Sequence, residues 1–201
     1  MEVFRFFFLI LLIISSFAHN LRGLSQIKRR ERSAGILMHI TSLPSNYGIG
    51  TLGAEAYRFA DFLVKAKQKN WQMLPLGPTG YGDSPYQSTS SYAGNPYMID
   101  LDILIDEKLL KKEEVDEVYW GGDERRVDFG NMFIKRFPIL EKAFSRFKTN
   151  PNYDAFVKEN KDWLDDYASF MSLKETYGYV QWTEWPEGIK LRKPTTYHFA
   201  Y

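Results

Sequence analysis

The sequence contains no cysteine, which excludes disulfide bonds, thiolate metal sites and a cysteine nucleophile. Its three histidines, His19, His39 and His198, are too widely separated to show metal-ligand spacing, so we expect no metal site. The formal net charge is only +1, which predicts no nucleic-acid partner. Repeats and low-complexity tracts are absent as well. What remains is 201 residues with 44% hydrophobic and 25% charged residues, which suits one globular domain or a large part of one.

The N-terminal region has an apolar stretch from Phe6 to Ala18 that is short for a membrane span and suits the core of a signal peptide. Basic residues follow it, and such residues tend to stay in the cytoplasm: Arg22, Lys28, Arg29, Arg30 and Arg32. We assign residues 1–32 to an apolar leader and a basic linker and expect a cytoplasmic protein. Export, or a membrane tether through residues 6–18, is the alternative, and an upstream stretch included by start-codon choice would also explain the leader.

Residues 33–100 show the pattern of a parallel βαβ unit. Residues 34–43 form an apolar run rich in branched side chains, which predicts a buried strand. Apolar residues at helical spacing predict a helix over residues 52–69: Leu52, Ala56, Phe59, Leu63 and Ala66. A second short apolar run, residues 70–78, ends in prolines and predicts the second strand. Ligands bind at the C-terminal ends of such strands, where the loop that follows residue 76 begins.

Residues 101–201 change character. Four stretches predict helices: residues 108–118, 131–148, 150–160 and 162–178. Asn150 before Pro151 is typical of a helix start, Gly178 of a helix end, and Pro138 should kink or interrupt its helix. We therefore expect a helical insertion from Leu101 to about Gly178, followed by a tail without clear periodicity.

The sequence offers no complete set of catalytic groups. Ser84 has no identifiable histidine base, and the glycines of residues 48–53 lack the acid that a dinucleotide site requires, so they indicate a tight turn. Neighbouring acids on a helix point about 100° apart and do not face one site, so we interpret three pairs as solvated surface: Glu113–Glu114, Asp123–Glu124 and Asp165–Asp166. His39 is interpreted as a hydrogen-bonded core histidine.

The loop "GPTGYGDSPYQSTSSYAGNPY", residues 77–97, is the best candidate binding site. Its tyrosines offer apolar faces with hydroxyls at their edges: Tyr81, Tyr86, Tyr92 and Tyr97. Its other polar side chains offer donors and acceptors: Asp83, Ser84, Gln87 and Asn95. A sugar has apolar C–H faces and a rim of hydroxyls, which this set matches. The alternative is a rigid loop that packs only on itself.

Three segments resemble the N-terminal part of the bacterial 4-α-glucanotransferases, also called amylomaltases or disproportionating enzymes, of glycoside hydrolase family 77. They are "GILMHITSLPSNYGIGTLGAEAYRFADFL", "WQMLPLGPTGYGDSPYQSTSSYAGNPYMIDLDIL" and "WLDDYASFMSLKE…YGYVQWTEWP". The match runs from about Arg32 to Pro186, and the stretch from Trp71 to Asp100 is the most specific part. "HITSLP" departs from the family's usual "HPTSLP" at Ile40, a change we regard as harmless.

The resemblance implies an α/β fold, the N-terminal part of a (β/α)8 TIM-type barrel, with a helical insertion subdomain. It implies transfer of α-1,4-glucan segments between maltooligosaccharides, with retention and without a cofactor. Residues matching Tyr86 and Ser84 line the donor-sugar site in the family, in a segment that also includes Asp83 and Gln87. Tyr81 matches a tyrosine that contacts glucan away from the active centre.

The family's catalytic carboxylates lie on later barrel strands, so no residue of this sequence inherits their roles. We therefore expect a truncated transferase that is inactive alone, and the sequence predicts no oligomeric state. A non-catalytic α-glucan-binding module and a non-functional fragment are the alternatives.

Overall fold

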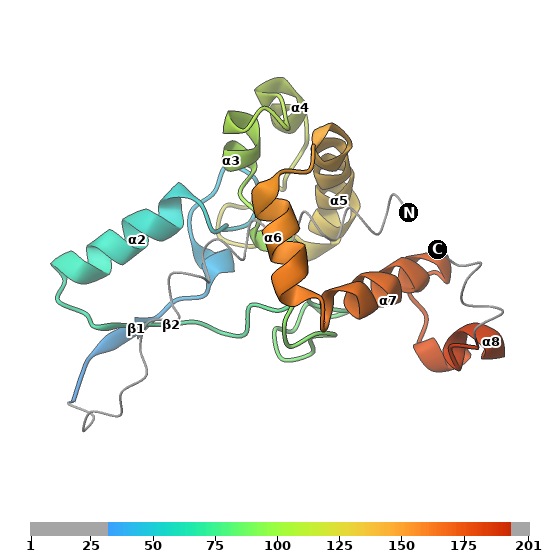
Figure 1. Cartoon of the computed structure of the whole chain (residues 1–201). Coiled ribbons are helices and arrows are strands. Elements are labelled where there is room, and N and C mark those ends of the chain that lie inside the picture. The colour runs from blue at the N-terminus through green and yellow to red at the C-terminus, as the bar shows by residue number, and fades with distance from the viewer. Residues whose placement is uncertain (1–31, 194–201) are drawn as a thin grey trace. The chain divides into compact units, whose positions relative to one another are not determined.

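The structure is a computed structural model that describes residues 32–193 (Figure 1). The apolar stretch of residues 6–18 lies outside the described residues, as do His19, His198 and the basic positions before Arg32. Within residues 32–193, no helix has the length and hydropathy needed to cross a bilayer.

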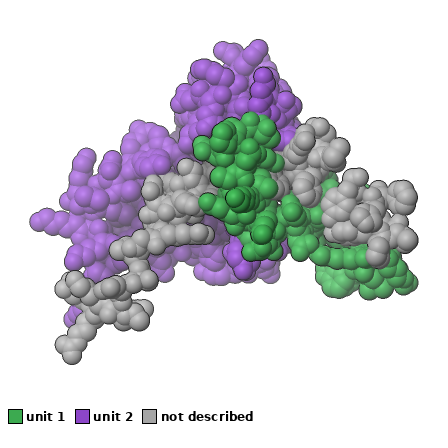
Figure 2. Space-filling view, viewed as in Figure 1, with its two compact units in different colours: residues 1–9, 149–201 green, residues 10–148 purple. Residues whose placement is uncertain are grey.

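The described residues form two compact units that divide between Lys148 and Thr149 (Figure 2). Among the described residues, the first unit in chain order ends at Lys148 and contains both strands and the first helices; it is purple and marked unit 2 in Figure 2. The second begins at Thr149 and contains the last helices; it is green and marked unit 1 in Figure 2. The candidate loop of residues 77–97 lies wholly in the first.

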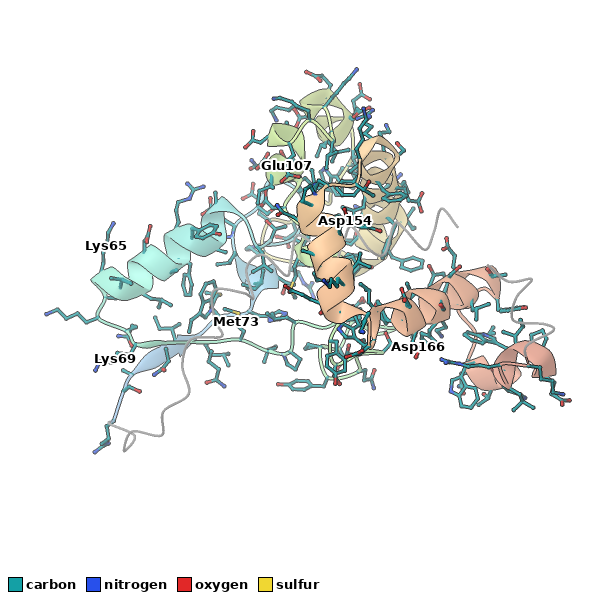
Figure 3. All side chains as sticks on the ribbon, viewed as in Figure 1. Lys65, Lys69, Met73, Glu107, Asp154 and Asp166 are labelled. Carbon is teal, nitrogen blue, oxygen red and sulfur yellow. The ribbon has the colours of Figure 1, made fainter. Side chains whose placement is uncertain are left out.

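The first unit opens with the βαβ arrangement that the sequence predicts. Strand β1 (Gly35–Leu37) pairs in parallel with β2 (Asn70–Gln72), and α2 (Ala54–Lys65) connects them (Figure 1). Ile36 lies opposite Trp71 in the register. Lys65 and Lys69 mark the turn by which the chain leaves α2 and enters β2 (Figure 3).

The first strand is shorter and more exposed than the sequence predicts. Residues 34–43 were expected to form one buried strand, but β1 ends at Leu37, whose surface is 57% exposed. The buried part of this run is Ile40, in the 3-10 turn η1 (Ile40–Ser42). The reason is that β1 has a single strand neighbour among the described residues, whereas Ile40 packs into a cluster with Leu43, Leu52, Ala56 and Met98.

Helix α2 and the segment after β2 cover this cluster. Phe59 of α2 packs edge-on against Trp71 of β2, with ring centroids 4.8 Å apart. Met73 and Leu76 pack against the same cluster, and Figure 3 shows Met73 just beyond the end of β2. The helix expected over residues 52–69 is therefore confirmed in its central part, with Leu52 buried just before it begins. Ala66, expected on the apolar face, is exposed just after the helix ends.

The chain then reaches the 3-10 turn η2 (Pro96–Met98) and three helices, α3 (Leu101–Asp106), α4 (Lys112–Asp116) and α5 (Phe129–Arg146). The helix expected over residues 108–118 is present but shorter, as α4, and α3 was not expected as a separate helix. Helix α5 is not interrupted at Pro138. Proline cannot donate to the carbonyl four residues earlier, and that residue, Ile134, is exposed, so water can satisfy its carbonyl.

The second unit contains α6 (Pro151–Asn160), α7 (Leu164–Thr176), the 3-10 turn η3 (Trp182–Glu184) and α8 (Glu187–Lys190). Asn150 caps α6 as predicted, because its side chain accepts a hydrogen bond from the Tyr153 N–H at 3.0 Å. Gly178, with φ +64°, follows the end of α7 as expected. Asp154 and Asp166 mark α6 and α7 in Figure 3.

Candidate functional site

The candidate site is the loop of residues 77–97, the long segment without helix or strand between β2 and η2 (Figure 1). The strand expected over residues 70–78 ends earlier, at Gln72, so a short segment containing Met73 and Leu76 connects β2 to the loop. We call residues 80–92 the tip. We call residues 95–100 the stem; they comprise the end of the loop and the residues up to the start of α3. The two differ in their contacts.

The stem is buried and held by backbone hydrogen bonds. The Asn95 N–H donates to the Leu76 carbonyl at 2.8 Å, which closes the base of the loop. The Asn95 side chain accepts from the Tyr97 N–H at 2.9 Å, and the Met98 carbonyl accepts from the Leu52 N–H at 2.9 Å. Asn95 was expected among the binding groups, but it is buried and occupied in shaping η2.

Asp100 fixes the end of the stem. One carboxylate oxygen accepts from the Ile103 N–H at 3.1 Å and so caps α3, and the other accepts from the Thr51 hydroxyl at 2.5 Å. The same carboxylate lies against Gly53, where any Cβ would collide with it. The glycine-rich turn of residues 48–53 therefore exists for close packing, which agrees with the tight turn that the sequence predicts.

Arg136 of α5 also binds the stem. Its side chain is fully buried, and its Nη2 donates to the carbonyls of Tyr97 and Ile99. Sequence reasoning missed it, although a signal existed. Arg136 is the one charged residue in the apolar stripe of α5, with Met132, Leu140 and Ala143.

Three of the four loop tyrosines are on the surface, and one is not. Tyr81 is fully exposed, and Tyr86 and Tyr92 are each 73% exposed. Tyr97 was expected to offer a binding face, but it is 5% exposed. Its ring packs against Phe137 of α5, with centroids 5.8 Å apart, because η2 turns the side chain into the core.

Two adjoining turns shape the backbone of the tip around Asp83, Ser84 and Gln87. The Asp83 N–H donates to the Gly80 carbonyl at 3.1 Å, and the Gln87 N–H donates to the Ser84 carbonyl at 3.1 Å. Gly82 and Asp83 both have positive φ, at +93° and +54°, which this tight reversal requires. Partial burial raises the pKa of the Asp83 carboxyl above its ordinary value.

Ser84 and Gln87 differ in how freely they can meet a ligand. The Ser84 hydroxyl accepts a hydrogen bond from the Tyr86 N–H at 3.3 Å, which orders the backbone under Tyr86. Gln87 is exposed. The tip therefore presents the rings of Tyr81 and Tyr86 beside a carboxyl, a hydroxyl and an amide.

The acidic pairs outside the loop are not equally solvated. Glu114 was interpreted as solvated surface, but its side chain is only 19% exposed and binds Arg146 through two contacts of 2.6 Å. The hydrogen bonds from Arg146 are the main cause that lowers the pKa of Glu114 to about 2, and the hydrogen bond from the Lys111 N–H lowers it further. Asp123 and Asp166 instead form exposed ion pairs, with Arg125 and Arg192. Each of the three thus pairs with an arginine.

His39 follows β1 and stands just before η1. We expected a hydrogen-bonded core histidine, but its buried Nδ1 has no hydrogen-bond partner among the described residues. Burial lowers the pKa of His39 below its ordinary value. Across residues 32–193, no three His, Asp or Glu side chains are grouped so that they could hold a metal ion.

Comparison with known proteins identifies the family. The family model described as 4-alpha-glucanotransferase matches residues 38–200, which include the whole candidate loop. The chain belongs to the 4-alpha-glucanotransferase family. It is 50% identical over 158 residues to the 4-alpha-glucanotransferase of Clostridium butyricum, covering 78% of this chain and 32% of that protein. It is 47% identical over 161 residues to the enzyme of Streptococcus pneumoniae TIGR4, covering 79% of this chain and 32% of that protein.

A solved structure agrees. The chain superposes on an amylomaltase from Streptococcus agalactiae in complex with acarbose with a TM-score of 0.76 and 45% sequence identity, covering 81% of this chain and 34% of that one. The chain thus spans about a third of the length of these 4-alpha-glucanotransferases.

Proposed function

We propose that the tip of the loop binds α-1,4-glucans and that the chain supplies this part of a 4-alpha-glucanotransferase. The observation that carries the proposal is the exposure of Tyr81 and Tyr86 on a turn that also presents Asp83, Ser84 and Gln87. Family membership and the superposition on an acarbose-bound amylomaltase support it.

Each side chain has a role that suits its surroundings. The Tyr86 ring offers an apolar face for the C–H surface of a glucose unit, and its hydroxyl can bond at the rim. Ser84 orders the turn below Tyr86 and presents its hydroxyl beside it. Gln87 and Asp83 supply an amide and a carboxyl for sugar hydroxyls. Tyr81, five positions before Tyr86, would contact a glucose unit further along the glucan.

We propose that β1, α2 and β2 form the first part of a (β/α)8 barrel and that residues 101–178 form a helical insertion in it. The parallel pairing of β1 and β2 through a connecting helix is the unit from which such barrels are built. The exposure of Leu37 fits a strand that packs on further strands in the complete fold. The C-terminal end of β2 leads into the candidate loop, which is the end where such barrels bind their ligands.

The proposed reaction of the complete fold is transfer of α-1,4-glucan segments between maltooligosaccharides, with retention at the sugar carbon. Retention requires two carboxyl groups about 5 Å apart. In the family these lie on barrel strands after β2, so the residues of this chain would bind and orient glucan while other carboxylates do the chemistry. We therefore propose that these 201 residues alone are inactive. The proposed compartment is the cytoplasm, because of the basic residues that follow the apolar stretch.

Titration calorimetry of the 201-residue chain with maltoheptaose tests the binding site. We expect binding that Tyr86→Ala abolishes, because the mutation removes the stacking face without touching the buried stem. Tyr119→Ala is the matched control, since Tyr119 is an exposed tyrosine of the same unit outside the loop. Absence of binding by the native chain, or equal binding by the Tyr86 variant, would overturn the proposed site.

Glucose release from maltotriose tests the division of labour between binding and chemistry. We expect none from the chain alone, because the carboxyl pair is missing. Sustained formation of glucose and longer maltooligosaccharides by the purified chain would show that the residues present here suffice for catalysis.

A further inference from the structure

We propose that Arg136 is a positioning residue for the glucan site, because its buried guanidinium clamps the stem carbonyls and thereby fixes the direction in which the tip leaves the core. This inference deepens the proposed function and rests on it. Arg136 lies 50 residues after Tyr86 in the sequence and contacts no residue of the tip in the hydrogen bonds of the described structure.

The first support is the position of the clamp. Arg136 Nη2 donates to the carbonyls of Tyr97, at 3.4 Å, and of Ile99, so a single nitrogen holds two stem residues together. The N–H groups of Asn95 and Met98 are bonded within the loop base and η2. Arg136 therefore binds carbonyl groups of the stem, whose N–H groups already have partners in the loop base and in η2.

The second support is the aromatic ring on which the guanidinium lies. Its carbon sits 5.6 Å from the ring centroid of Trp120. The Trp120 indole N–H donates to the Val115 carbonyl at 2.9 Å, and the Tyr47 ring packs edge-on against Trp120 at 6.1 Å. The Tyr47 hydroxyl donates in turn to Asp102 at 2.6 Å. The guanidinium is thus positioned by Trp120 as well as by the stem carbonyls.

The third support is that packing alone does not require a charge at this position. Arg136 is fully buried, and its Nε and Nη1 have no hydrogen-bond partner among the described residues. Burial lowers the pKa of the guanidinium to about 10, although the charge of Asp100 opposes this change. An apolar side chain like those of Met132 and Leu140 would avoid this desolvation. What arginine adds at this position is the donor that holds the two carbonyls.

The test compares two arginines of the same helix in the 201-residue chain. Arg136→Met removes the clamp and keeps an apolar side chain of similar length. Arg146→Met is the control, because Arg146 also lies on α5 and donates to a backbone carbonyl, that of Leu109, but holds α4 through Glu114. The readouts are amide hydrogen exchange by NMR, maltoheptaose affinity by calorimetry and the free energy of unfolding in urea.

We expect Arg136→Met to speed exchange of the Asn95, Tyr97 and Met98 amides about tenfold, as for a locally destabilised segment. We also expect it to weaken maltoheptaose binding about tenfold, because binding groups that leave their geometry lose much of their effect. The free energy of unfolding should change little, since loss of the carbonyl bonds is offset by loss of the buried charge. Arg146→Met should speed exchange in α4 and leave stem exchange and affinity unchanged.

The inference is overturned if Arg136→Met leaves stem exchange or affinity at the native value, or if exchange rises equally throughout the unit. If the methionine variant does not fold, Arg136→Lys replaces it, because lysine keeps the charge but its side chain ends one atom short of the position of Nη2. The lysine variant should then show faster stem exchange and weaker binding than the native chain, and native values would overturn the inference. If the native chain binds no maltoheptaose, the proposed function fails, while stem exchange still tests the clamp by itself.

Discussion

The tip and the stem are separated by only two residues in the sequence, and both contain tyrosine, proline and aspartate, yet they lie in opposite environments. The tip exposes Tyr86 at 73%, whereas the stem buries Tyr97 at 5%. Hydrogen bonds of the tip are local turns, such as Asp83 to Gly80. Those of the stem reach Leu76, Leu52 and the side chain of Arg136.

This difference separates two uses of one residue type. A tyrosine on the tip leaves its ring exposed, where we propose that it meets a glucan, whereas a tyrosine in the stem contributes its ring to the core. Mutations in the stem should therefore lower the free energy of unfolding more than mutations in the tip. The mutations below are given in order of decreasing expected effect on stability.

Tyr97→Ala should have the largest effect on stability. The mutation removes a buried ring that packs against Phe137 and Phe129, and such changes cost about 3–5 kcal/mol. Urea denaturation followed by circular dichroism measures the loss. Tyr81→Ala is the matched tip variant, and its fully exposed ring predicts a change within about 0.5 kcal/mol. Equal losses for the two variants would contradict the division into tip and stem.

Asp100→Ala should come next, with a loss of about 2 kcal/mol, because it removes the cap of α3 and leaves the Thr51 hydroxyl without its acceptor. Asp128→Ala is the control. Asp128 caps α5 through the Asn131 N–H at 2.9 Å, but this bond is exposed, so about 1 kcal/mol is expected. If the two aspartates contribute equally, the Thr51 bond adds nothing and the stem is held by other contacts.

The sequence predicted the exposed turns of the tip better than it predicted the buried stem. Alternation, helical spacing and turn residues are local signals, and they predicted the βαβ unit and the turn containing Asp83, Ser84 and Gln87. The fate of Tyr97 depends on Phe137, forty residues later, and no local signal carries that contact. Arg136 was detectable as a charge in an apolar stripe, but the carbonyls that it would meet were not.

The length of the first strand could not be predicted for a related reason. Residues 34–43 read as one apolar run, and apolar character does not distinguish a strand from a turn that enters the core. The structure ends β1 at Leu37 and buries Ile40 in η1 instead. The expected interruption at Pro138 is not seen, and α5 continues through it. Proline removes one helical hydrogen bond, to the Ile134 carbonyl, and Ile134 is exposed, so water can replace that bond.

Glu114→Gln should have a smaller effect, visible as a change in pH dependence away from the loop. The bonds from Arg146 hold the folded-state pKa of Glu114 at about 2, below its ordinary 4.5. The carboxylate therefore adds stability that is fully present above pH 4.5 and is lost as the pH falls toward 2. Urea denaturation between pH 2 and 6 should show a flatter profile for the glutamine variant. A variant with the native pH profile would show that the ion pair contributes nothing to folding.

Asp83→Asn should have the smallest effect, and its sign should be opposite. Partial burial in the tip raises the folded-state pKa of Asp83 above its ordinary 3.8, so the ionised carboxylate opposes folding at neutral pH, and this penalty disappears as the pH falls below the folded-state pKa. Asparagine tolerates the φ of +54° and removes the charge, so the variant should be slightly more stable than the native chain at pH 7 and equal to it at pH 3. Paired urea titrations at the two pH values measure the difference. A less stable variant at pH 7 would mean that the carboxylate makes a favourable contact in the tip, and the tip would then resemble the stem in using its polar groups for folding.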